Sequence, residues 1–345
     1  MARRPFALLL LLALLAGCGP RQGRTLTIMT HDSFAVSESI AVAFEAENNV
    51  TLRFLVSGDT GEAVNKAVLA AGNPLADVFY GVDNTFLSRA LEAEIFEPYD
   101  SPLLEQIPDA FELDPTHNAL PVDYGDVCLN YDRAYFADRG LEPPGSLEDL
   151  LRPEYRGLLV VENPATSSPG LAFLLATIGH FGEEGYLEFW QGLRGNDVLV
   201  VNDWETAYRT EFSGSSGRGP RPIVVSYGSS PPFEVMFSPQ PPTEAPTAAV
   251  VSDGSCFRQI EFVGVLRGTE NRDLAEAWID FMLSVPFQED MPLQMYVFPV
   301  NTEAALDEIF TLHLAVPENP AFVSPEAIAA NREAWVEAWT ETVLR

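Results

Sequence analysis

Apolar residues recur with two different periods along the first hundred residues of the chain. Their spacing predicts strands over 25–30, 50–56 and 77–82, and helices over 37–47, 61–71 and 84–93. Gly72-Asn73-Pro74 is expected to end the second of these helices. Because each helix follows a strand, this order predicts a parallel sheet covered by helices.

A second α/β unit is predicted from the rest of the sequence. Apolar runs predict strands over 122–131, 157–161, 223–227 and 259–266, and helices over 170–179 and 272–284. We expect the final helix to begin at Ser324-Pro325, and Ser146 with Asp149 resembles the capping box of a short helix. The segments 213–222 and 238–246 are rich in Gly, Pro or Ser, which is typical of surface loops.

The N-terminal segment has the pattern of an export signal. Arg3 and Arg4 precede an apolar run that is too short to span a bilayer. The run ends in Leu15-Ala16-Gly17-Cys18, which resembles the bacterial lipobox; the alternative is an ordinary signal peptide with a chance cysteine. We therefore expect residues 1–18 to be a lipoprotein signal peptide that ends at the lipidated Cys18, and residues 19–24 to be a tether.

The composition favours a folded protein with an acidic surface. Hydrophobic residues make up 47% of the 345 residues, which is too much for intrinsic disorder despite a net charge of −30. The length is sufficient for two domains with their own cores. This charge argues against a nucleic-acid partner, because phosphates need a cationic footprint, and against docking on anionic lipid through a basic patch.

Besides Cys18, the chain has two cysteines, Cys128 and Cys256. Disulfides persist in exported proteins, so a bridge between these two residues is one interpretation. Two unbridged cysteines that pack as small hydrophobic side chains are the other. The cysteine count leaves both interpretations open.

Three aspartates stand in loops that follow predicted strands. They are Asp32, Asp59 and Asp83, each beside a small polar residue. Because ligands of parallel α/β sheets bind beyond the carboxyl ends of the strands, the three carboxylates would favour a cation at one crevice. The alternative is that each aspartate caps the helix that follows it.

Aromatic residues in later turns are candidates for the same crevice. Trp204 and Tyr227 lie beside polar, turn-rich residues, and Tyr296 belongs to an aromatic turn; packing in a core is the alternative for each. The four histidines have no metal-ligand spacing, and the sequence contains no nucleophile elbow, Walker loop or dinucleotide motif. The sequence therefore predicts no catalytic or metal site.

Seven short motifs follow one another along nearly the whole chain after the leader. They are THDSF (30–34), ADV (76–78) with GVDN (81–84), PVDYG (121–125), TSSPGL (166–171), DWETAY (203–208), SY (226–227) with SP (230–231), and YVFPV (296–300). In this order they resemble the thiamine-binding solute receptors of ABC importers, and NREAW (331–335) in the final helix matches as well.

This resemblance implies an α/β, two-lobed type II periplasmic-binding-protein fold. Each lobe is a mixed sheet flanked by helices, and two crossing hinge strands near 121–124 and 259–264 join the lobes. The implied division is lobe 1 over 25–121 and 259–305, lobe 2 over 122–258, and a C-terminal helical segment over 306–345 that is assigned to neither lobe. Cys128 and Cys256 would then lie on neighbouring strands, as a bridge requires.

The resemblance also implies which residues bind the ligand. Asp59 matches the acidic residue beside the positive thiazolium, and Thr60 stands where the family usually has glycine. Ser167 matches a hydroxyl near the phosphate or hydroxyethyl end of the ligand. Tyr227 and Ser229 match residues at the polar end.

Four further positions match aromatic residues of the family. Trp204 and Tyr296 match rings that pack on the ligand, and the second is more often tryptophan. His31 and Phe233 each stand where the family has tyrosine. These two departures affect the pyrimidine subsite most and leave room for a related cationic or heteroaromatic ligand.

The implied protein is not an enzyme and needs no cofactor. It is an exported, lipid-anchored receptor, expected to be a monomer, that captures thiamine or a thiamine phosphate and delivers it to an ABC permease from the periplasm or cell surface. A polyamine or other cationic solute receptor of the same fold is the alternative. A ferric-ion receptor fits less well without a Tyr-Tyr pair, as does a thiamine-pyrimidine synthase without a cysteine-rich motif.

Overall fold

The computed structural model describes residues 23–214, 219–236 and 243–345 of the chain. The predicted leader with Cys18, most of the predicted tether, and parts of the two predicted loops lie outside the described residues. Within these ranges, no helix is long and apolar enough to cross a bilayer.

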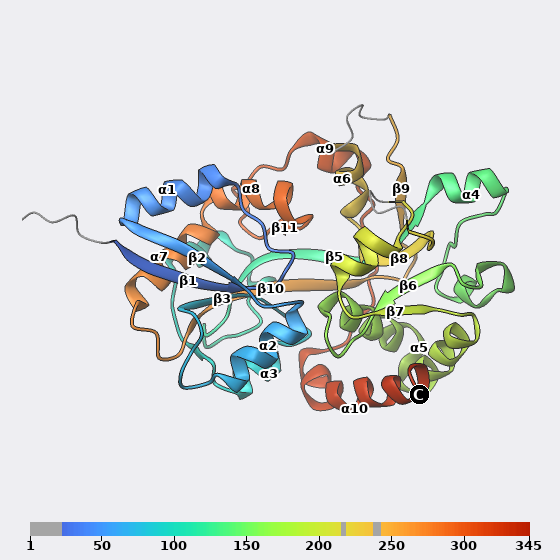
Figure 1. The fold of residues 1–345 in the computed structure, drawn as a ribbon, viewed down its shortest axis with the longest axis horizontal. Coiled ribbons are helices and arrows are strands. Elements are labelled where there is room, and N and C mark those ends of the chain that lie inside the picture. The colour runs from blue at the N-terminus through green and yellow to red at the C-terminus, as the bar shows by residue number, and fades with distance from the viewer. Residues whose placement is uncertain (1–22, 215–218, 237–242) are drawn as a thin grey trace, which may run out of the picture.

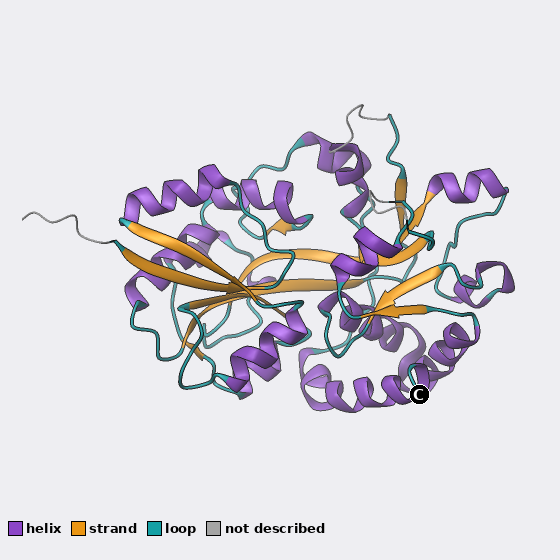
Figure 2. Cartoon of the chain, in the orientation of Figure 1, coloured by secondary structure: helices purple, strands orange, loops and turns teal. Residues whose placement is uncertain are grey.

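In the described part of the chain, eleven strands form one mixed sheet (Figure 1 and Figure 2). The strands are β1 (Arg24–Thr30), β2 (Val50–Val56), β3 (Val78–Asp83), β4 (Phe96–Glu97), β5 (Leu120–Asp132), β6 (Leu159–Glu162), β7 (Leu199–Val201), β8 (Ile223–Tyr227), β9 (Thr247–Val250), β10 (Phe257–Leu266) and β11 (Phe298–Pro299). Their order is β2-β1-β3-β10-β5-β8-β6-β7, with β4 beside β10 and with β9 and β11 beside β5. β1 pairs in parallel with β2 and β3, as the predicted order of alternating strands and helices implied.

Helices cover both faces of this sheet (Figure 2). They are α1 (Glu38–Asn48), α2 (Thr60–Leu69), α3 (Leu87–Glu92), α4 (Arg133–Arg139), α5 (Ser168–Gly195), α6 (Ser230–Met236), α7 (Arg272–Leu283), α8 (Val285–Met295), α9 (Glu308–His313) and α10 (Pro325–Val343). The observed fold is therefore the α/β, two-lobed fold that the motifs implied.

Strands β5 and β10 run between the two lobes (Figure 1). They pair antiparallel with each other over most of their length. One end of β10 pairs with β3 in the first lobe, and the far end of β5 pairs with β8 and β9 in the second lobe. These two strands are therefore the hinge strands.

In the first lobe, opposite faces of β1 contribute to two separate cores. Leu26 and Ile28 belong to the core beneath α1, α7 and α8, where Phe44 packs edge-on against Trp278 with ring centroids 4.9 Å apart. Met29 belongs to the core on the other face. The alternation of side chains along the strand thus allows helices to bury both faces of the sheet.

The C-terminal helix α10 packs beside the long helix α5. Trp190 of α5 contacts Trp339 of α10 edge to face, with centroids 5.4 Å apart. The helix predicted over 170–179 is longer than expected, because α5 continues to Gly195 through a kink at Gly182, where φ is 74°. As predicted, Ser324 caps α10: its hydroxyl accepts the amide hydrogen of Ala327 at 3.2 Å.

Two other predicted helices begin later than expected. The helix predicted over 84–93 begins at Leu87, because the Asp83 carboxylate accepts the amide hydrogens of Thr85 and Phe86 and holds these residues in a turn. Ser146 is not the N-cap that the predicted capping box requires: the 3-10 helix Glu148–Leu151 has Leu147 at its N-cap, without a side-chain cap hydrogen bond. Its Asp149 carboxylate accepts from the Gly145 amide at 2.9 Å.

Cys128 and Cys256 form a disulfide, and both residues are fully buried. Cys128 lies in β5, and Cys256 immediately precedes β10. The bond joins residues that are 128 positions apart in the sequence, with Cα atoms 4.4 Å apart. It therefore ties the second-lobe ends of the two hinge strands together.

Candidate functional site

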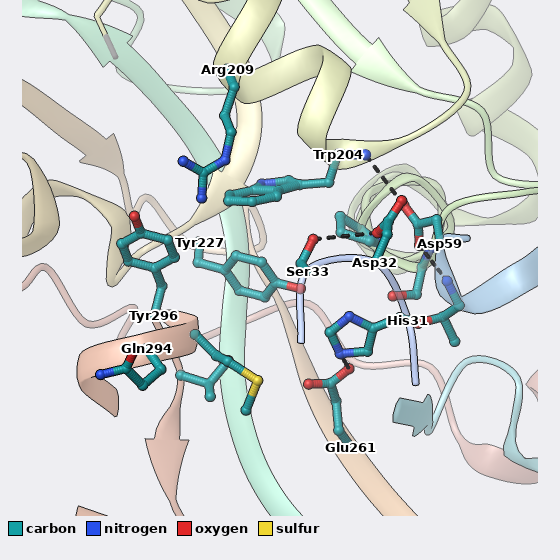
Figure 3. A pocket seen from close by; sticks show the side chains of 15 residues that line it. His31, Asp32, Ser33, Asp59, Trp204, Arg209, Tyr227, Glu261, Gln294 and Tyr296 are labelled. Carbon is teal, nitrogen blue, oxygen red and sulfur yellow. Dashed lines mark hydrogen bonds and ion pairs between the residues drawn. The ribbon is translucent and has the colours of Figure 1, made fainter. Parts of the chain in front are cut away.

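A pocket lies where the hinge strands pass between the lobes (Figure 3). Its cavity has a volume of about 40 Å³ and is partly open to solvent. The first lobe contributes side chains from the β1–α1 loop and from the ends of α2 and α8, the second lobe contributes α5, β8 and the segment after β7, and β10 crosses below. The lining residues are His31, Asp32, Ser33, Asp59, Thr60, Ser168, Pro169, Trp204, Arg209, Tyr227, Glu261, Gln294, Met295, Tyr296 and Val297.

Asp59 connects the two lobes at this pocket. It caps α2, accepting from the Thr60 amide at 2.6 Å, and it also accepts from the amides of Ser168 at 3.1 Å and Trp204 at 3.2 Å in the second lobe. Burial raises the pKa of the Asp59 carboxyl to about 7, and these hydrogen bonds oppose the shift. Asp59 thus caps a helix and also lines the pocket, so both interpretations of this residue apply.

The other two loop aspartates have different surroundings. Asp32 lines the pocket, and burial together with the nearby Asp203 raises its pKa. Asp83 is fully buried outside the pocket lining, where it accepts from Thr85 and Phe86. The structure therefore brings Asp32 and Asp59 together in the pocket and uses Asp83 to form a turn.

Aromatic rings form the second-lobe wall of the pocket (Figure 3). The Trp204 ring lies 6.4 Å from Tyr227 and 6.1 Å from Tyr296, measured between centroids. Tyr208 stacks on Trp204 at 5.0 Å, and the Trp204 indole donates to the Ser226 hydroxyl at 3.0 Å. Because these contacts hold the rings in place, they form a rigid surface that a flat ligand can stack on.

Gly125 in β5 has no side chain, and this leaves room for the ring of Tyr227. A Cβ atom at Gly125 would lie 2.9 Å from Cδ1 of Tyr227, closer than side chains normally approach. Glycine at this point of the hinge strand therefore allows the Tyr227 ring to lie flat across β5.

Arg209 contributes a positive charge to the edge of this aromatic wall. It lies in the π-helix Thr206–Glu211, pairs with Glu205 at 2.5 Å, and its guanidinium lies 5.8 Å from the centre of the Trp204 ring. In Figure 3 Arg209 and Glu261 are at opposite ends of the pocket. The pocket is therefore polarised, with one arginine at one end and carboxyl groups at the other.

Six of the nine predicted ligand residues line the pocket: His31, Asp59, Thr60, Trp204, Tyr227 and Tyr296. The other three lie directly behind its wall. The Ser167 hydroxyl caps α5, the Ser229 hydroxyl donates to the backbone carbonyl of Tyr296, and Phe233 contacts the rings of Tyr296 and Phe310. In the described structure these three residues support lining residues. Whether they touch a ligand remains a prediction.

Several lining residues had no signal of their own in the sequence. Glu261 lies inside an apolar strand, Gln294 lies in a helix, and Arg209 follows a motif in which only the aromatic residues were singled out. Ser168 lines the pocket next to the predicted Ser167, whose buried hydroxyl caps α5 and also hydrogen-bonds to the Asp59 side chain.

A buried polar cluster lies at the floor of the pocket. The Tyr80 hydroxyl is 2.7 Å from Oδ2 of Asp123 on β5 and 3.1 Å from Oε2 of Glu261 on β10. Nε2 of His31 is 3.5 Å from the other Glu261 oxygen. Burial lowers the pKa of His31 to about 4, so this histidine is neutral at pH 7.

The lining suits a flat organic cation better than an anion. Carboxyl groups at Asp32, Asp59 and Glu261 favour positive charge, and the faces of Trp204 and Tyr227 attract a cation by about 0.5–2 kcal/mol each when water is excluded. Among the described residues, no group of three or more His, Cys, Asp or Glu side chains is arranged to hold a metal ion.

Fold and pocket together define the class of protein: a two-lobed solute-binding protein with a pocket between the lobes. Residues 73–311, more than half of the chain, match a family described as bacterial extracellular solute-binding protein. The protein belongs to this family.

The chain is also similar over nearly its whole length to receptors of one kind. It is 29% identical to the thiamine-binding periplasmic protein of Salmonella typhimurium, with 100% of each chain covered. It is 28% identical to the protein of the same name from Escherichia coli, with 93% of this chain and 94% of the relative covered. A solved periplasmic thiamin binding protein has a TM-score of 0.82 at 26% identity, covering 95% of this chain and 98% of that one. These findings confirm the resemblance that the motifs indicated.

Proposed function

We propose that this protein captures thiamine or a thiamine phosphate in the interlobe pocket and delivers it to an ABC importer. The observation that carries the proposal is a pocket with an aromatic wall and several buried carboxyl groups, in a chain that resembles thiamine-binding proteins from end to end. Thiamine carries a permanent positive charge on an aromatic ring, so both features of the pocket match it.

Each lining group has a role in this proposal. Trp204, Tyr227 and Tyr296 stack on the rings, and Asp59 with Thr60 faces the thiazolium. His31 lies at the pyrimidine end. Ser167, Ser229 and Phe233 complete the site from behind the wall, by holding lining residues or by direct contact when the lobes shift.

The expected affinity is consistent with this set of contacts. Nanomolar binding needs about −12 kcal/mol after the costs of closing the lobes and immobilising the ligand. Two or three stacked rings and a carboxylate in a dry pocket can together approach that value, whereas one contact cannot. Asp59 also bonds to amides of the second lobe, so the residue that faces the cation helps to hold the lobes closed.

Delivery follows from lobe closure, since closing changes the surface that the receptor presents to a permease. We propose that the receptor acts outside the cytoplasmic membrane, as a monomer without catalytic activity or cofactor, and is anchored by a lipid on Cys18. The lobe boundaries 25–121 with 259–305 and 122–258 belong to the same proposal. The helix α10, which packs on α5, is assigned here to the second lobe.

Calorimetric titration of ligand-free protein tests the ligand directly. Thiamine, thiamine phosphates, spermidine and Fe(III) are titrated in parallel, and we expect sub-micromolar binding of thiamine or its phosphates. Sub-micromolar binding of spermidine without any response to thiamine would identify a polyamine receptor instead. Binding of Fe(III) alone would identify a ferric-ion receptor.

Two variants test the site. Trp204→Ala removes the central ring and Asp59→Asn removes the charge, and each is expected to weaken thiamine binding by at least about tenfold. Phe322→Ala and Asp138→Asn are matched controls, because both side chains are exposed and neither lines the pocket. Unchanged affinity in both site variants would refute the site assignment even if thiamine binds.

A further inference from the structure

Three carboxyl groups lie side by side where the hinge strands cross. In the antiparallel register, Glu261 of β10 stands opposite Asp123 of β5 on one side and Asp83 of β3 on the other. All three residues are buried, and Glu261 also lines the ligand pocket. Like charges in this arrangement repel one another strongly unless a proton or a cation separates them.

Hydrogen-bond geometry indicates that this row holds a proton. The single hydrogen of the Tyr80 hydroxyl faces Asp123 at 2.7 Å and Glu261 at 3.1 Å. One hydrogen satisfies one of these contacts, so the second is favourable only when a carboxyl group carries a hydrogen of its own. Burial and the neighbouring carboxylates raise the pKa of Glu261 well above its usual range, in the same direction as the hydrogen-bond geometry indicates.

The groups that face Glu261 supply no positive charge. They are His31 from the β1–α1 loop, Tyr80 and Asp83 from β3, Asp123 from β5, and Tyr227 from β8. His31 is neutral at pH 7, as its low pKa shows. Among the described residues, no arginine or lysine forms an ion pair with Asp83, Asp123 or Glu261. Arg332 of α10 interacts electrostatically with Asp83. A positive charge that enters the pocket is therefore the partner that Glu261 and Asp123 lack.

We propose that Glu261 lies beside the ligand at the His31 end of the pocket and that the Glu261–Asp123 pair releases one proton to solvent when the cation binds. This inference rests on the proposed function. A carboxyl O–H bond breaks, its electron pair stays on the carboxylate oxygen, and the proton passes to the buffer. The ligand's positive charge takes the place of the proton, so the net charge of the pocket is unchanged.

This exchange explains why a carboxyl pair lies on the hinge strands themselves. In the empty receptor, the shared proton links β3, β5 and β10 through Tyr80, Asp123 and Glu261. In the loaded receptor, the ligand's charge stabilises both carboxylates at the point about which the lobes move. Glu261 thereby selects for a positively charged ligand as well as contacting it.

Titration calorimetry of the intact protein with thiamine at pH 8, in two buffers of different ionisation enthalpy, counts the protons released. At this pH Asp59, whose pKa is about 7, is already mostly ionised, so it contributes little. We expect release of about one proton per thiamine bound. In Glu261→Gln we expect release close to zero and about tenfold weaker binding, because the amide can donate to Asp123 without losing a proton.

Glu184→Gln is the matched control, since this exposed glutamate on α5 lies away from the pocket, and it should release as many protons as the wild type. Asp123→Asn, which alters the other member of the pair, should abolish proton release in the same way as Glu261→Gln. The infrared carbonyl band of an un-ionised carboxyl group gives a readout in the ligand-free protein. In Glu261→Gln this band should lose the intensity of one carboxyl group and not vanish, because other buried carboxyl groups with raised pKa values, such as Glu162, also contribute to it.

The outcomes distinguish a failure of the proposed thiamine binding from a failure of the proposed proton release. Absence of thiamine binding by the wild type would refute the proposed function. Thiamine binding without proton release, or equal release from Glu261→Gln and the wild type, would overturn the inference and leave the proposed function intact. An infrared carboxyl band of equal intensity in the wild type and Glu261→Gln would also overturn it.

Discussion

Reduction of the Cys128–Cys256 bond tests how the hinge strands are stabilised. The bond joins residues 128 positions apart, and it is buried at the second-lobe ends of β5 and β10. A cross-link of this kind stabilises a protein mainly by restricting the unfolded chain. Its contribution therefore follows from the length of the loop that it closes.

The loop length sets the expected magnitude. For a separation of 128 residues, the loop-closure relation predicts a contribution of about 5 kcal/mol at 25 °C, and measured values for disulfides are typically about 2–4 kcal/mol. We therefore expect the free energy of unfolding to fall by about 3–5 kcal/mol on reduction. This is a large part of the stability of an ordinary domain.

Urea unfolding followed by tryptophan fluorescence and circular dichroism measures this difference. Oxidised protein is compared with protein that was reduced in denaturant and refolded under reductant. A Cys128→Ala/Cys256→Ala variant serves as the control, and its unfolding midpoint should not respond to reductant. A difference below about 1 kcal/mol between the oxidised and reduced proteins would refute the loop-entropy reasoning.

The remaining predictions concern pH and ligand charge. Burial raises the pKa of Asp59 to about 7, so the folded protein keeps a proton that the unfolded chain loses near pH 4. The part of the stability that Asp59 contributes, measured by urea unfolding as the difference between the wild type and Asp59→Asn, should therefore fall by about 3 kcal/mol from pH 5 to pH 8. His31, whose pKa is lowered to about 4, acts in the opposite direction in both proteins. A difference that stays constant or rises over this range would contradict the prediction. Arg209→Gln should weaken binding of thiamine phosphate about tenfold in calorimetry and leave thiamine unchanged, because it removes the pocket's arginine. Equal weakening of both ligands would contradict a role for Arg209 in phosphate recognition.

Much of the fold could be predicted because apolar runs in this chain have clear ends. The strand Ile223–Tyr227 has the predicted bounds, since Pro222 precedes its apolar run and Gly228 follows it. The start of α3 could not be predicted in the same way. It depends on the direction of one side chain. The Asp83 carboxylate accepts the amide hydrogens of Thr85 and Phe86 and holds these residues in a turn, so the helix begins after them.

The site was predictable where a polar turn interrupts an apolar pattern. Asp59 and Trp204 are of this kind, and both line the pocket. Glu261 could not be predicted in this way, because it lies inside an apolar strand whose sequence is typical of a buried core. Its side chain reaches the pocket only because β5 and β10 cross there. Ser168 lines the pocket where Ser167 was predicted, because the Ser167 hydroxyl is fully buried, where it caps α5 and hydrogen-bonds to Asp59.

The central claim is that the interlobe pocket of this receptor binds thiamine or a thiamine phosphate. Calorimetric titration of the ligand-free protein with both compounds, beside the Trp204→Ala variant, tests it most directly. We expect the wild type to bind at least one of them with sub-micromolar affinity and a stoichiometry of about one. In Trp204→Ala this binding should be at least about tenfold weaker. No binding of either compound to the wild type, or equal binding to the wild type and the variant, would contradict it.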